Sequence, residues 1–117
     1  MLPSDSTNKE ITRLTQEALQ LFRGDAHAAL TLSSQSVALA RSLGESQLLS
    51  RALRARAMAH GSAGKIDAAR ADFAEALALA RAEEEVKLEG QCLHGLSVAD
   101  FHLGDFAFGV FATSGFF

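Results

Sequence analysis

The stretch AGKIDAARADFAEALALARAEEE, residues 63–85, decides the fold, because it repeats RGDAHAALTLSSQSVALARSLGE, residues 23–45, without a gap. The spacing between the two copies is 40 residues, both contain the block ALAR, and Gly24 aligns with Gly64. A further step of the same length leads to Gly104. Self-similarity at a fixed period is the signature of a solenoid of repeated structural units.

The composition predicts the class of these units. The chain has 117 residues, 48% of them apolar and 21% charged, which fits one globular domain. Ala, Leu, Arg and Glu favour helices and dominate, whereas Trp and Tyr are missing and the single proline is at position 3. We therefore expect an all-α fold of antiparallel helix-turn-helix repeats.

Glycines and capping residues divide the chain into helices. Asp25 can cap the second helix and Gly44 can end it, whereas Glu84 must form the next equivalent turn without a glycine. Gly104 is expected to open the second helix of an incomplete third pair. We predict a disordered leader over residues 1–7 and a single domain over 8–117, with repeats at about 8–43, 46–83 and 86–117. The predicted helices are Asn8–Phe22, Ala26–Leu43, Ser46–Ala63, Ile66–Ala82 and Val86–Leu103.

Small residues recur at one position of each pair, where they let two antiparallel helices approach closely. These residues are Ala29, Ala69 and Gly109. On the first helix of the third pair, the residues expected to face the core are Leu93, Leu96 and Val98.

Three charged residues bear on the packing. Arg13 and Arg56 depart from the pattern, because they fall where helix packing favours apolar side chains. Asp72, with the acidic residues near it, is interpreted as part of a solvated face rather than as a catalytic carboxylate.

The stretch GKIDAARADFAEAL, residues 64–77, resembles the tetratricopeptide repeat family, whose pattern is Gly, apolar, Ala, aromatic, Ala-Leu. LGDF at 103–106, followed by Gly109, resembles the opening of this pattern, and RGDAHAAL at 23–30 is a weaker version. The spacing exceeds the family's common value of about 34 residues. It is similar to the longer variants found in bacterial signalling and transcription-regulatory proteins. The resemblance implies a short right-handed solenoid of about two and a half to three repeats.

The sequence contains no nucleophile motif, phosphate-binding loop or metal-ligand cluster, so we expect neither an enzyme nor a bound cofactor or metal. Cys92 and His94 lie on different faces of one helix and cannot jointly hold a metal ion. The single cysteine is expected to be a small buried hydrophobic residue.

One local feature points to a ligand. Arg51 and Arg54 share a helix face, and no acidic residue lies between Glu45 and Asp67. The resemblance implies that the first helices of successive pairs line a concave groove that receives a peptide. The repeat spacing places Gln91 and His94 beside the two arginines, so the candidate groove residues are Arg51, Arg54, Gln91, His94 and His102. Arginine recognises carboxylates in a bidentate way, which favours an acidic peptide or a chain terminus; the alternative is that these arginines only keep the surface hydrated.

The C-terminal stretch GDFAFGVFATSGFF, residues 104–117, has no charge after Asp105. Such apolar surfaces usually mark an interface, and we expect a homo-oligomer through this end of the chain. The candidate interface residues are Phe101, Phe106, Phe108 and Phe111.

These observations favour a protein–protein interaction module that binds a partner peptide or protein in its groove. The alternative is the N-terminal sensory or dimerisation fragment of a bacterial signalling or transcription-regulatory protein, such as a repeat region associated with a diguanylate cyclase. A net charge of −3 gives no reason to expect nucleic acid or a membrane surface as partner. The chain shows neither a secretory signal nor an apolar span, so we expect a cytoplasmic protein.

Overall fold

The computed structural model describes the backbone of residues 3–111 and the side chains of residues 5–101. Over that range the chain is all-α, as predicted, and no strand is present. The helices are α1 (Pro3–Leu21), α2 (Ala26–Leu43), α3 (Ser46–Ser62), α4 (Ile66–Ala82) and α5 (Val86–Phe111).

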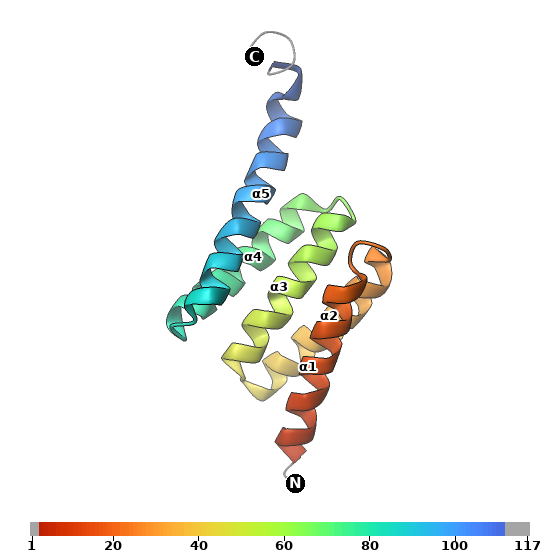
Figure 1. The fold of residues 1–117 in the computed structure, drawn as a ribbon, viewed down its shortest axis with the longest axis vertical. Coiled ribbons are helices and arrows are strands. Elements are labelled where there is room, and N and C mark those ends of the chain that lie inside the picture. Colours follow the sequence, from red (N-terminus) through yellow and green to blue (C-terminus); the bar gives the residue numbers. More distant parts are fainter. Residues whose placement is uncertain (1–2, 112–117) are drawn as a thin grey trace.

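The helices form two layers (Figure 1). Consecutive helices pack against each other as antiparallel hairpins, and α1, α3 and α5 lie in one layer while α2 and α4 lie in the other. Contacts within the first layer join α1 to α3 and, at only a few positions, α3 to α5. This arrangement is that of a helical repeat, and it places one face of α1, α3 and α5 on a common surface.

The turns between helices follow the sequence signals. Asp25 caps α2 by accepting a hydrogen bond from the backbone N–H of Ala28 at 3.0 Å. Gly44 and Gly64 have φ angles of 70° and 80°, the left-handed conformation that ends a helix at low cost in glycine. Glu84 occupies the same place after α4 with φ 56°, and it is the one residue other than glycine with positive φ in the described chain. The prediction that this turn forms without glycine is therefore confirmed.

The core consists of small and branched apolar residues from all five helices. Ala29 and Ala69, at the position predicted for close helix approach, are fully buried, which confirms their role. Phe73 packs beside Ala69, and Leu53 lies in the largest buried cluster. Because the helices meet through alanines, added bulk at these contacts would push the helices apart.

The two ends of the chain differ from the prediction. Helix α1 begins at Pro3, so residues 3–7 are helical and not a disordered leader. Proline is well tolerated in the first turn of a helix, where its missing N–H has no partner to lose. Helix α5 continues through Gly104 to Phe111, so the predicted turn at that glycine is wrong. A glycine within a helix costs only about 1 kcal/mol and does not end the helix by itself.

The environments predicted for two charged residues, Arg13 and Asp72, are also wrong. Arg13 lies on the exposed side of α1 and pairs with Glu10 and Glu17. Asp72 is buried rather than solvated, and its two carboxylate oxygens accept hydrogen bonds from Arg56 at 2.7 and 3.0 Å. Arg56 therefore occupies a packing position because α4 supplies a carboxylate opposite it.

On α5, Leu96 packs against the core as predicted, but Leu93 and Val98 are exposed. The spacing of apolar residues therefore predicted the burial of Leu96 correctly but was wrong in predicting that Leu93 and Val98 face the core. They project from α5 on sides that α4 does not cover. Within the described residues, no helix is long and apolar enough to cross a membrane.

Candidate functional site

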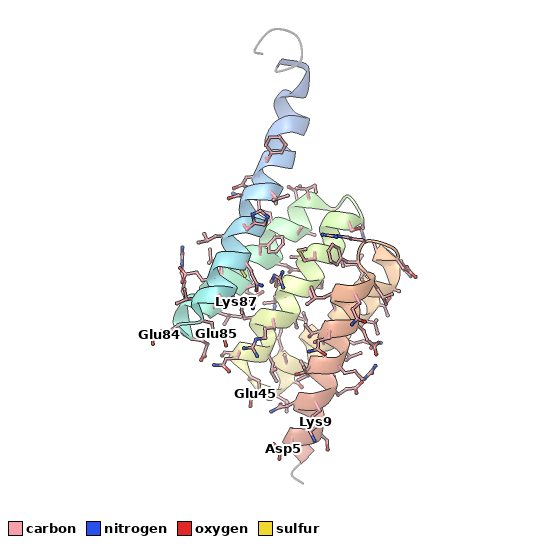
Figure 2. The ribbon with its side chains drawn as sticks, viewed as in Figure 1. Asp5, Lys9, Glu45, Glu84, Glu85 and Lys87 are labelled. Atoms are coloured by element: carbon pink, nitrogen blue, oxygen red, sulfur yellow. The ribbon has the colours of Figure 1, made fainter. Side chains whose placement is uncertain are left out.

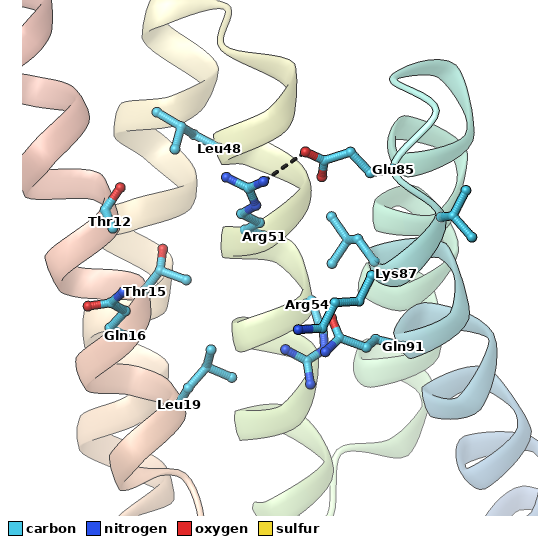
Figure 3. Close-up of a pocket in the computed structure, with 12 residues that line it drawn as sticks. Thr12, Thr15, Gln16, Leu19, Leu48, Arg51, Arg54, Glu85, Lys87 and Gln91 are labelled. Atoms are coloured by element: carbon cyan, nitrogen blue, oxygen red, sulfur yellow. Dashed lines mark hydrogen bonds and ion pairs between the residues drawn. The ribbon is translucent and has the colours of Figure 1, made fainter.

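A groove of about 600 Å³ runs between α1, α3 and α5 (Figure 3). Helix α3 forms its floor, α1 one wall, and the start of α5 the other. The lining residues are Thr12, Thr15, Gln16 and Leu19 from α1, Leu48, Arg51 and Arg54 from α3, and Glu85, Val86, Lys87, Leu88 and Gln91 from α5 and the turn before it.

The structure brings three of the five predicted groove residues together. Arg51, Arg54 and Gln91 all line the groove. His94 is exposed on α5 and is not part of the lining, because it lies one turn beyond Gln91 and about 60° around the helix. The side chain of His102 lies outside the described residues.

The two arginines differ in their partners. The Nη2 of Arg51 donates to the Oε1 of Glu85 at 2.7 Å, which ties α3 to the turn before α5. Glu84, Glu85 and Lys87 lie together at this turn (Figure 2). The charge of Arg51 is therefore already balanced within the chain.

Arg54 has no such balance. Its Nε is buried and has no hydrogen-bond acceptor, and no acidic residue of the described chain forms an ion pair with it. Lys87 and Gln91 extend toward it from α5 (Figure 3). Burial raises the pKa of the nearby Cys92 thiol, an effect that the charge of Arg54 opposes only in part. Cys92 thus remains a neutral thiol and does not neutralise the guanidinium.

The wall contributed by α1 was not predicted from the sequence. A spacing of 40 residues maps Arg51 and Arg54 onto Ile11 and Leu14, which are both buried. The groove residues of α1 are instead offset by 39 positions, so that Thr12 corresponds to Arg51. The pattern of apolar residues within α1 was the signal that could have shown this shift.

The groove is positively charged within an acidic protein. Three cations, Arg51, Arg54 and Lys87, line it against a single acid, Glu85. Hydroxyl and amide groups of α1 provide hydrogen-bonding partners, and the hydroxyl of Thr15 is held by Ser36 at 2.6 Å. This surface is suited to an extended acidic segment, because it combines unbalanced positive charge with polar groups that can bond a peptide backbone.

A second polar cluster lies between α3 and α4, away from the groove. The Nε2 of His60 lies 3.7 Å from the Oδ2 of Asp72, which also binds Arg56. Burial lowers the pKa of His60, and this outweighs the opposing effect of the Asp72 carboxylate. We interpret this cluster as part of the packing between the two helices. Among the described side chains, no three His, Cys, Asp or Glu residues are placed to hold a metal ion together.

The chain matches no protein-family model, no curated protein and no solved structure.

Proposed function

We propose that this chain is a protein-interaction module whose groove binds an acidic segment of a partner peptide or protein. The observation that carries the proposal is Arg54, a cation at the groove whose buried Nε has no acceptor within the described chain. No acidic residue of the described chain neutralises this guanidinium, and a carboxylate of a ligand bound in the groove would do so.

The neighbours of Arg54 favour a carboxylate. Its guanidinium presents a planar fork of donors that matches the two oxygens of a carboxylate. Lys87 adds a second cation and Gln91 an amide beside it. Hydrogen bonds to charged groups contribute about 1.5–3 kcal/mol each, so this cluster can serve as the anchor of the complex.

The rest of the groove suits an extended peptide rather than a small anion. Thr12 and Gln16 offer hydrogen-bonding groups along α1, and Leu19 and Leu48 provide apolar contacts. A bound peptide with acidic residues flanked by apolar ones would match these charged, polar and apolar groups of the groove. The proposed role is binding, without catalysis.

The proposal is tested by selecting binders from a displayed library of random peptides. The wild-type chain is expected to enrich peptides containing Asp, Glu or a free C-terminal carboxylate. Arg54→Glu should lose this enrichment while its far-ultraviolet circular dichroism stays unchanged. Arg23→Glu is the matched control, because it makes the same change of charge at an exposed residue outside the groove lining. Equal enrichment of acidic peptides by Arg54→Glu would refute the proposal.

A further inference from the structure

Among the described residues that line the groove, Glu85 is the one acid. Its Oε1 accepts a hydrogen bond from the Nη2 of Arg51 at 2.7 Å (Figure 3). The side chain of Glu85 is 18% exposed, whereas that of Arg51 is 50% exposed. The carboxylate is thus largely enclosed, while the guanidinium that it binds remains accessible from the groove.

The backbone fixes the position of Glu85 at the turn before α5. Its N–H donates to the carbonyl oxygen of Ala80 at 2.9 Å, and its carbonyl oxygen accepts from the N–H of Glu89 at 2.9 Å. These two hydrogen bonds join the end of α4 to the first turn of α5. The carboxylate therefore reaches Arg51 from a backbone that is held on both sides.

The preceding repeat shows that an acid at this turn does not form an ion pair by itself. Glu45 aligns with Glu85 at the spacing of 40 residues, and its N–H donates to the carbonyl oxygen of Ala40 in the same way, at 3.2 Å. Glu45 is exposed, however, and has no ion-pair partner among the described side chains. The residue of α1 that aligns with Arg51 is Ile11, which is uncharged and buried. The ion pair of Glu85 is therefore a feature of this groove and not of the repeat.

We propose that Glu85 sets the charge specificity of the groove: it occupies Arg51, so that the groove accepts one acidic side chain of a peptide, at Arg54, and rejects a second one beside it. This inference rests on the proposed function, because it concerns the peptide that Arg54 anchors. A guanidinium already paired with a carboxylate gains little from another, and the two carboxylates would repel each other. Specific binding sites commonly use such an unfavourable charge against the wrong ligand.

The geometry of α3 gives the position of the rejected acid in the peptide. Arg51 and Arg54 are three residues apart on one helix face, which separates them by about 4.5 Å along the helix axis. The walls formed by α1 and α5 direct a bound peptide along α3 (Figure 3). In an extended peptide, side chains two residues apart point to the same side and lie about 6.6 Å apart. Because arginine side chains are long, an acid two residues from the anchoring acid is the one that reaches Arg51.

Selection from a displayed library of random peptides tests the inference by comparing the wild type with Glu85→Gln. The wild type is expected to enrich peptides with one acid and no second acid two residues away. Glu85→Gln leaves Arg51 without its carboxylate, so pairs of acids at that spacing should become frequent. Glu84→Gln is the matched control, because it removes the same charge at the neighbouring residue, which is exposed and does not line the groove. The peptides that it selects should match those of the wild type.

Dissociation constants measure the same effect. Peptides from the wild-type selection receive a second Asp two residues before or two residues after their own acid. For the wild type and Glu84→Gln, neither placement should lower the dissociation constant. For Glu85→Gln, one placement should lower it about tenfold, which corresponds to about 1.4 kcal/mol. Adding Arg51→Gln to Glu85→Gln should remove this gain. Loss of a partly exposed ion pair costs little stability, so circular dichroism should show the same helix content for all variants.

The outcomes separate this inference from the proposed function. If the wild type enriches no acidic peptides, or if Arg54→Glu binds them equally well, the proposed function is wrong and this inference falls with it. If the peptides bind through Arg54 but a second Asp helps the wild type as much as Glu85→Gln, or helps neither, only the inference about Glu85 is overturned. An equal gain in Glu84→Gln would also overturn it, because the effect would then follow from net charge alone.

Discussion

Replacing Gly95 by alanine tests how α5 is held against α4. A Cβ atom at this position would lie 2.4 Å from the Cε1 and Cζ atoms of Phe73 and 2.7 Å from its Cδ1. Non-bonded carbon atoms prefer separations of about 3.5–4.0 Å, so the ring or the helix would have to move by about 1 Å. Phe73 is 5% exposed and packs in one buried cluster with Ala57 and Ala69, which leaves the ring little room to move.

The expected cost of this overpacking is about 1–3 kcal/mol. Replacing glycine by alanine within a helix also stabilises it by about 1 kcal/mol. Gly90→Ala isolates that second effect, because nothing lies within 4 Å of the new methyl group. We therefore expect Gly90→Ala to raise the free energy of unfolding and Gly95→Ala to be less stable than Gly90→Ala by the full packing cost.

Urea denaturation followed by circular dichroism at low protein concentration measures both variants. In a Phe73→Leu background, Gly95→Ala should cost less, with a coupling energy of about 0.5–3 kcal/mol. Equal stabilisation by Gly90→Ala and Gly95→Ala would refute the close contact between α4 and α5.

Three further predictions concern the turns and the buried polar cluster. Glu84→Gly should raise the free energy of unfolding by about 0.5–1 kcal/mol, because glycine adopts the φ of 56° without strain; thermal denaturation measures it, and a lower melting temperature would contradict it. Asp72→Asn should lower the free energy of unfolding by about 2–3 kcal/mol, because Arg56 loses its carboxylate in a largely buried position; an unchanged urea midpoint would contradict it. Burial lowers the pKa of His60 below its ordinary value of 6.5, so its contribution to stability is complete above pH 6.5 and decreases as the pH falls toward the folded-state pKa. His60→Gln should therefore lose less stability than the wild type between pH 7.5 and 5.5, and identical pH profiles would exclude this role.

The middle of the fold could be predicted from the sequence because its signals are local and repeated. The bounds of α2 and α4 agree with the prediction, and α3 differs by one residue at its end. Glycine at positions 44 and 64 ends two of these helices by a backbone conformation that other residues adopt only with strain. The alignment of the two copies also predicts a turn at Glu84, because this residue aligns with Gly44 at the spacing of 40 residues. Glu84 itself carries no sequence signal for a turn.

The pairings between helices could not be predicted, because they depend on how far each helix is rotated and displaced. The sequence gives no sign that Asp72 faces Arg56, or that Glu85 balances Arg51 but leaves Arg54 without an acid. A shift of one residue in α1 likewise moved the groove wall from the expected positions to Thr12 and its neighbours. Such a shift rotates a helix face by about 100°, so exact repeat spacing is not sufficient to assign a groove.

The most direct test of the proposed groove is the nuclear magnetic resonance signal of the Arg54 Nε–H group, assigned by its loss in Arg54→Lys. Titration with an acidic peptide taken from the library selection should shift this signal in a saturable way. The same peptide with Asn and Gln in place of Asp and Glu, and with an amidated C-terminus, should not. Because Arg51 already binds Glu85, its Nε–H signal should move less than that of Arg54. Binding of the acidic peptide with an unchanged Arg54 signal would contradict the proposal that this arginine is the anchor.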